Sequence, residues 1–134
     1  MAGASDLGGG VMTFHFDTRP ESLAWLVDWA AETEEVAALH LFGSRATGAR
    51  RRKADAPTVP DLDVAYEVAG ATEQDRFETS FDVGAGATAI DFFHAFGVPL
   101  DLEFMDGDTT PRITRFVAGG GICIWRRDGR PGAA

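Results

Sequence analysis

The stretch "LFGSRATGARRRKADAPTVPDLDVAYEV", residues 41–68, joins two apolar runs through a long polar connector. The first run, 35–43, ends at a Gly-Ser pair, which is typical of a turn. The second run, 61–68, begins with Asp61 and Asp63 and alternates polar and apolar residues. Such alternation predicts a strand with one apolar face. We therefore expect two core strands, with a basic connector and a pair of aspartates between them.

Around these strands the sequence predicts three or four helices and two more strands. A helix begins near Pro20, because a proline in the first turn followed by Glu21 suits the start of a helix. A second helix begins near Thr72, and residues 84–97 either continue it after a glycine break or form a helix of their own. The remaining elements are a strand at 99–106, a helix from the Thr-Pro at 110–111 to Gly119, and a strand at 122–126.

This order of elements favours an α+β fold, a small mixed β-sheet in two layers with helices packed mainly on one face. We expect one domain over residues 18–127. Residues 1–17 are expected to be a flexible leader that includes a short strand or extended arm at 11–17, and residues 128–134 a flexible tail.

The composition limits the classes of function. The chain has 21 acidic and 12 basic residues and a net charge of -9, which disfavours broad nucleic-acid binding and suits a site that requires a cation. It has no apolar run of membrane-spanning length and no signal-peptide pattern, so we expect a cytoplasmic protein that does not enter a membrane. Its one cysteine, Cys123, fits a reducing compartment and is expected to be a buried, inert thiol.

The two alternating strands carry acidic residues at matching positions. Asp61 and Asp63 share one face of the strand at 61–68, and Asp101 and Glu103 share one face of the strand at 99–106. If these strands are neighbours, three or four carboxylates meet on one side of the sheet. Hard oxygen ligands favour Mg²⁺ or Mn²⁺, and two such ions can bind both the attacking and the leaving oxygen in a phosphoryl transfer.

The turn after the first strand is a candidate phosphate site. Gly43 allows a phosphate to approach the backbone closely, Ser44 offers an N–H and a hydroxyl, and Arg45 supplies a positive charge. An Asp-x-Asp pair or a Gly-Ser pair alone is a weak signal. The combination of both with a third acid on a later strand is far more specific.

The segments "LFGSRATG", "DLDVA" and "PLDLEF" together resemble the minimal nucleotidyltransferase domain of the DNA polymerase β superfamily, over roughly residues 20–126. The resemblance implies a polymerase-β-like palm that transfers a nucleoside monophosphate, AMP from ATP, to a hydroxyl acceptor and releases pyrophosphate. It further implies that Asp61, Asp63 and Asp101 are catalytic metal ligands, and that the turn at Gly43 and Ser44 binds the nucleotide phosphates.

The resemblance also implies partners. A palm-like domain nearly fills the chain, so the acceptor pocket must come from a second copy, from the substrate or from another protein. Minimal nucleotidyltransferases form toxin–antitoxin pairs with helical proteins of the HEPN type, in which the acceptor can be a tyrosine of the partner. The alternative is a catalytically weak nucleotide-binding or antitoxin-like module that neutralises such a partner.

One departure from the family pattern favours that alternative. Sixteen residues separate Ser44 from Asp61, and they include the basic run at 50–53. This run is either a solvated loop or a cluster that attracts a nucleotide. Glu103 is a fourth acid, either a ligand or simply the next outward position. For His40, Trp25 and Trp29, packing is a simpler explanation than catalysis or base stacking.

Overall fold

The computed structural model describes residues 20–43 and 61–128. The expectations for the leader, for Ser44 and Arg45, for the basic run at 50–53 and for the tail beyond Asp128 therefore lie outside the described residues.

The elements follow the predicted order. They are α1 (Pro20–Glu32), β1 (Val36–Phe42), β2 (Leu62–Val68), α3 (Glu73–Ser80), α4 (Ala85–Phe96), β3 (Leu100–Phe104), the 3₁₀ turn η2 (Gly107–Thr109), α5 (Pro111–Ala118) and β4 (Ile122–Arg126). Residues 84–97, which the sequence left open, form a helix of their own, since Gly84 and Gly97 adopt positive φ angles of 76° and 70° at its two ends. Thr72 caps α3 as expected, because its side chain accepts a hydrogen bond from the Asp75 N–H.

The four strands form one mixed sheet in the order β3-β2-β1-β4. β1 runs antiparallel to both β2 and β4, whereas β2 and β3 are parallel. A parallel pair needs a crossover connection, and α3 with α4 provides it here. The α+β fold class predicted from the sequence is confirmed. No helix in the described part of the chain is both long and apolar enough to cross a membrane.

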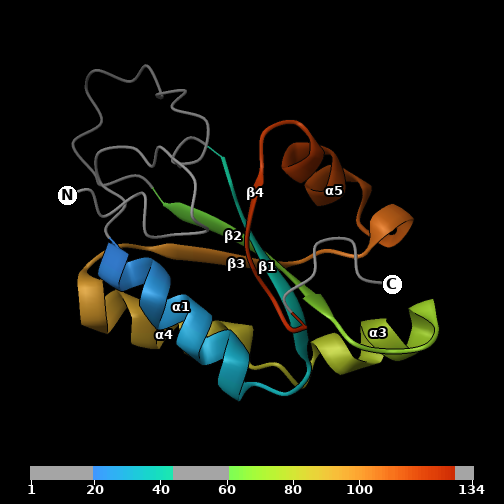
Figure 1. The fold of residues 1–134 in the computed structure, drawn as a ribbon, viewed down its shortest axis with the longest axis horizontal. Coiled ribbons are helices and arrows are strands. Elements are labelled where there is room, and N and C mark those ends of the chain that lie inside the picture. The colour runs from blue at the N-terminus through green and yellow to red at the C-terminus, as the bar shows by residue number, and fades with distance from the viewer. Residues whose placement is uncertain (1–19, 44–60, 129–134) are drawn as a thin grey trace.

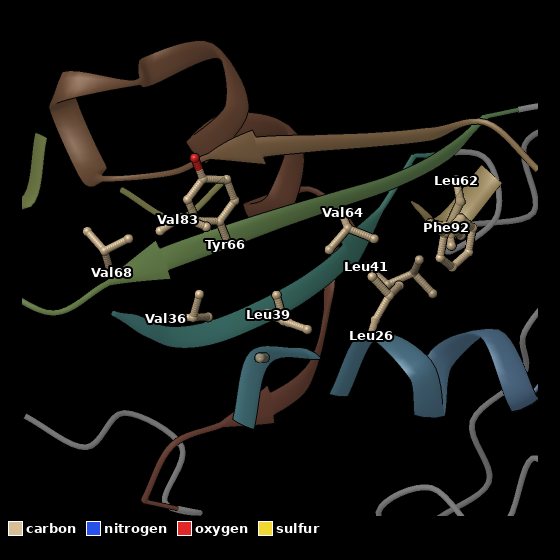
Figure 2. Close-up of a cluster of buried hydrophobic side chains, with 11 residues drawn as sticks. Leu26, Val36, Leu39, Leu41, Leu62, Val64, Tyr66, Val68, Val83 and Phe92 are labelled. Atoms are coloured by element: carbon tan, nitrogen blue, oxygen red, sulfur yellow. The ribbon is translucent and has the colours of Figure 1, made fainter. Parts of the chain in front are cut away.

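One face of the sheet forms the main hydrophobic core. Figure 2 shows Leu26 of α1 and Phe92 of α4 meeting the side chains of β1 and β2. The Phe92 ring is fully buried and packs edge-on against Trp25, with ring centres 5.4 Å apart. This packing explains Trp25 as a core residue, as the sequence suggested. The strand residues in the core are Val36, Leu39, Leu41, Leu62, Val64, Tyr66 and Val68.

The opposite face is covered at one end by α5, which lies across the sheet from α1 and α4 (Figure 1). Ile113 of α5 packs there with Phe42, Ala65 and Met105 in a second, smaller core. The sequence predicted helices mainly on one face and did not predict this partial cover. A register shift between Val36 and Ala38 helps to build it, because the extra residue turns Phe42 toward α5.

The end of β4 is tied to the end of α1. The guanidinium of Arg127 donates hydrogen bonds to the carbonyl oxygens of Ala30, Thr33 and Val36 at 2.9–3.0 Å. It thereby joins the end of α1, the turn that follows it and the start of β1 to the end of β4. These contacts join positions more than 90 residues apart in the chain.

Cys123 corrects one expectation. Its side chain is exposed, whereas the sequence predicted a buried thiol. The apolar neighbours suggested burial, but β4 is an edge strand, and only Ile122, Ile124 and Trp125 pack against the main core. The Cys123 thiol therefore remains on the surface.

Candidate functional site

The predicted carboxylates meet on neighbouring strands. Asp63 of β2 is directly opposite Asp101 of β3 in the parallel register, and Glu103 is opposite Ala65 one step farther along the same face. Asp61 immediately precedes β2 and is exposed. Asp63, Asp101 and Glu103 are partly buried. The structure thus brings together the acidic residues that strand parity selected.

The electrostatics of this group centre on Asp63. Burial raises the pKa of its carboxyl from 3.8 to about 7, with further contributions from the charges of Asp101, Asp61 and Glu103 and from a hydrogen bond with Asp101. The pKa of Glu103 is also raised, first by burial and then by a hydrogen bond and the negative charge of Asp101. Arg112 acts in the opposite direction on Glu103. The charges of neighbouring carboxylates therefore add to the effect of burial at Asp63, and Arg112 partly offsets them at Glu103.

Gly43 lies against this cluster. Its φ angle is +81°, a conformation that favours glycine, and a Cβ atom built there would overlap Oδ2 of Asp63. Phe42, the residue before it, pairs with Asp63 across β1 and β2. The turn and the aspartate are therefore packed together, and a side chain at position 43 would displace the carboxylate. Ser44 and Arg45 follow this turn outside the described residues.

The donor chemistry of the cluster fits a hard divalent cation. It offers carboxylate oxygens, and the repulsion between them, which contributes to the raised pKa values of Asp63 and Glu103, is an interaction that a cation would relieve. As these side chains stand, however, no group of three or more His, Cys, Asp or Glu within residues 20–43 and 61–128 is arranged to hold a metal ion. Binding of a cation would require the carboxylates to rotate toward a common centre.

Sequence reasoning missed an aromatic and basic rim beside the carboxylates. The rings of Phe42 and Phe116 are stacked, with centres 6.5 Å apart and planes 21° apart, and the guanidinium carbon of Arg112 is 5.4 Å from the centre of the Phe116 ring. Arg112 and Phe116 are four residues apart on α5, which places them on one side of a helix. That spacing was a usable signal, but no pattern in the sequence indicated that α5 lies over the acidic face.

A second polar cluster occupies the same face farther along the strands. Nε2 of His40 is 2.6 Å from Oε2 of Glu67, and Arg126 is 3.6 Å from the same oxygen. The hydrogen bond from His40 is the main cause that lowers the pKa of Glu67. His40 is buried, so the structural explanation predicted for it holds. The parity of Glu67 with Asp63 could have placed it on this face.

No protein-family model and no curated protein matches the chain. A similar fold occurs in a crystal structure of the toxin–antitoxin pair MntA–HpeT, in a form with two Asp-to-Glu substitutions two positions apart. The alignment has a TM-score of 0.50 and 17% sequence identity, and it covers 78% of this chain and 73% of the other. At this identity the likeness establishes a shared fold.

Proposed function

We propose that this protein is a divalent-metal-dependent nucleotidyltransferase. It would transfer a nucleoside monophosphate, AMP from ATP, to a hydroxyl acceptor and release pyrophosphate. The observation that carries the proposal is the meeting of Gly43, Asp63 and Asp101 at one end of the sheet. The fold is shared with a chain of a toxin–antitoxin complex, in which two acidic positions spaced like Asp61 and Asp63 have been substituted.

Each residue has a distinct role in this reaction. Asp61, Asp63 and Asp101 would hold Mg²⁺ or Mn²⁺, which when bound supplies charge stabilisation for the phosphoryl transfer. The Gly43 turn would bring backbone close to the triphosphate. Asp101 would also accept the proton of the acceptor hydroxyl once that hydroxyl comes within hydrogen-bond reach. The protein would act mainly by positioning and by neutralising charge, as is usual in phosphoryl-type transfers.

The acceptor is proposed to belong to a helical partner protein, such as a HEPN-type protein with an accessible tyrosine. A protein partner is supported by the similar fold in the MntA–HpeT crystal structure, where a chain of this fold belongs to a toxin–antitoxin complex. The carboxylate cluster is partly exposed, so an acceptor on another molecule has access to it.

The test combines binding with turnover. Calorimetry would measure binding of a non-hydrolysable ATP analogue with and without Mn²⁺, and a coupled assay would measure pyrophosphate release from ATP in the presence of a helical partner or of small hydroxyl acceptors. We expect Mn²⁺-dependent binding and release in the wild type. Asp63→Asn and Asp101→Asn should reduce release at least about 100-fold, because each removes a charged ligand.

The matched control is Asp91→Asn, an exposed aspartate on α4. It should leave both readouts unchanged. Equal release by the control and the two site variants would overturn the metal-site assignment. Binding of the ATP analogue without release under any condition would favour the nucleotide-binding module, and tight partner binding without nucleotide binding would favour an antitoxin-like module.

A further inference from the structure

We propose that Phe116 of α5, stacked on Phe42 and flanked by Arg112, is the binding surface for the base of the nucleotide. This inference rests on the proposed function, since it adds a base subsite to the same site. It gives Phe116 and Arg112 of α5 a role in the proposed reaction, and it gives Phe42 one besides its packing in the smaller core.

Phe42 lies beside the Asp63 carboxylate. Its Cα is paired with that of Asp63, and it immediately precedes Gly43 in the chain. Directly opposite positions on antiparallel strands have Cβ atoms about 4.5–5.5 Å apart. Phe42 therefore lies next to Asp63 on one side, and Asp101 lies next to Asp63 on the other. A nucleotide with its phosphates at Gly43 and Asp63 would begin beside the Phe42 ring.

Phe116 provides an exposed ring next to that of Phe42. Phe42 is 6% exposed, whereas Phe116, stacked beside it, is 55% exposed. Ile113 anchors α5 to the sheet in the small core, so Phe116 is not required there to hold the helix. The result is a buried ring next to the carboxylates and an accessible ring next to the buried one. A flat, partly apolar group can stack on such a surface while its charged end stays at the cluster.

Arg112 adds a positive charge beside the exposed ring. Its guanidinium contacts the Phe116 ring and also interacts electrostatically with Glu103 of the acidic cluster. Exposed contacts between a cation and a ring are weak, and the long arginine side chain can move aside for a nucleobase or stack on it. We expect the displaced guanidinium to bind a phosphate oxygen of the nucleotide.

The chemistry of the surface favours a nucleobase over other flat groups. Stacking on aromatic rings and on guanidinium planes is a common way in which proteins hold unpaired bases, and it discriminates little between them. We therefore expect ATP and GTP to bind with affinities within about threefold of each other, since no hydrogen-bond readout is part of this subsite.

The experiment compares ATP with inorganic tripolyphosphate, both in the presence of Mn²⁺, by calorimetry on the full chain. Tripolyphosphate has the phosphates but no base. Phe116→Ala should weaken ATP binding about tenfold or more, the usual effect of removing a stacking ring. It should leave tripolyphosphate binding unchanged. Phe116→Trp should restore ATP binding, whereas Phe116→Leu, which is apolar but has no ring, should not.

The control is Phe81→Ala, which removes a ring that is 71% exposed on the crossover side of the molecule. It should alter neither ligand's affinity. Equal ATP affinity in the wild type and in Phe116→Ala, with tripolyphosphate still bound, would overturn the base subsite and leave the proposed function standing. Failure of the wild type to bind either ligand would overturn both. Loss of tripolyphosphate binding in Phe116→Ala would show a general defect of the site and would also overturn the base subsite.

Discussion

The two faces of the sheet use the same strands in different ways. On the core face, Leu39, Val64 and Phe92 have no exposed surface. On the opposite face, Asp63 and Asp101 are partly exposed. Burial and the charges of neighbouring carboxylates raise the pKa of Asp63 there. Because side chains alternate along a strand, each residue serves one face only. Substitutions on the core face should therefore reduce stability strongly, whereas removal of a charge on the other face should increase it.

The largest effect is expected from Phe92→Ala in the core. Phe92 is fully buried and packs on Trp25 and Phe96, so its truncation should reduce the free energy of unfolding by about 3–5 kcal/mol. Urea denaturation followed by tryptophan fluorescence measures it, with Trp25 beside the site. The neighbouring ring of Phe93 is 50% exposed, and Phe93→Ala should cost less than about 1 kcal/mol. If Phe92→Ala loses as little stability as is expected of Phe93→Ala, Phe92 is not a core residue.

An intermediate effect is expected from Gly43→Ala, at the edge of the carboxylate face. Alanine at a φ of +81° is strained, and its Cβ would also overlap the Asp63 carboxylate, so we expect a loss of about 2–3 kcal/mol. Gly97→Ala separates the two causes. Gly97 has a φ of +70° but no atom within contact distance of an added Cβ, so that variant should lose only about 1 kcal/mol from strain.

The double variant Gly43→Ala with Asp63→Ala completes this comparison. Removal of the Asp63 carboxylate should relieve the overlap and return most of the difference between the two glycine variants. Thermal or urea unfolding is sufficient for the measurement. If Gly43→Ala and Gly97→Ala lose equal stability, the Gly43 turn does not pack on Asp63.

The smallest effect concerns the pH dependence of stability. The pKa of Asp63 is about 7 in the folded state, above its unfolded value of about 3.9, so the unfolded chain releases this proton at lower pH. Stability due to this group is therefore highest below about pH 4 and decreases as the pH rises to about 7. The full shift corresponds to at most ~4 kcal/mol, and solvent screening of a partly exposed carboxyl reduces this to about 1–2 kcal/mol.

Asp63→Asn provides the comparison for this prediction. Its melting temperature should decrease less than that of the wild type between pH 4 and pH 8, and at pH 8 it should be the more stable of the two. Mn²⁺ should raise the melting temperature of the wild type at pH 8 and have little effect on Asp63→Asn. A parallel decrease of both proteins with pH would contradict the raised pKa.

The sequence was sufficient to predict which residues of β2 and β3 face the core and which carry the acidic groups. Strand parity is a local property. Asp63, Asp101 and the apolar residues that alternate with them in β2 and β3 could therefore be assigned to faces before the fold was known. The sequence analysis expected the carboxylates to meet only if these two strands are neighbours, and the parallel pairing of β2 with β3 meets that condition. The break at Gly84, in contrast, could not be decided, because a glycine is compatible with both a bend and a new helix.

What escaped the sequence depends on contacts between distant segments. The register shift after Val36 is invisible in the run of apolar residues, yet it sets which side of the sheet Phe42 faces. The position of α5 over Ala65 and Phe42 depends on the path of the chain after β3. Exposure of Cys123 depends on β4 being an edge strand, and an apolar neighbourhood in the sequence does not reveal that.

The tie between Arg127 and the end of α1 has a consequence for synthesis of the chain. β1 has β4 as one of its two neighbours, and among the strands that the structure describes β4 is the last to be made. Until residue 127 has emerged, one edge of β1 has no neighbour in this sheet and the carbonyls of Ala30, Thr33 and Val36 lack their arginine. β1 therefore gains its second neighbour only when β4 has been made, although these two are the first and last of the described strands.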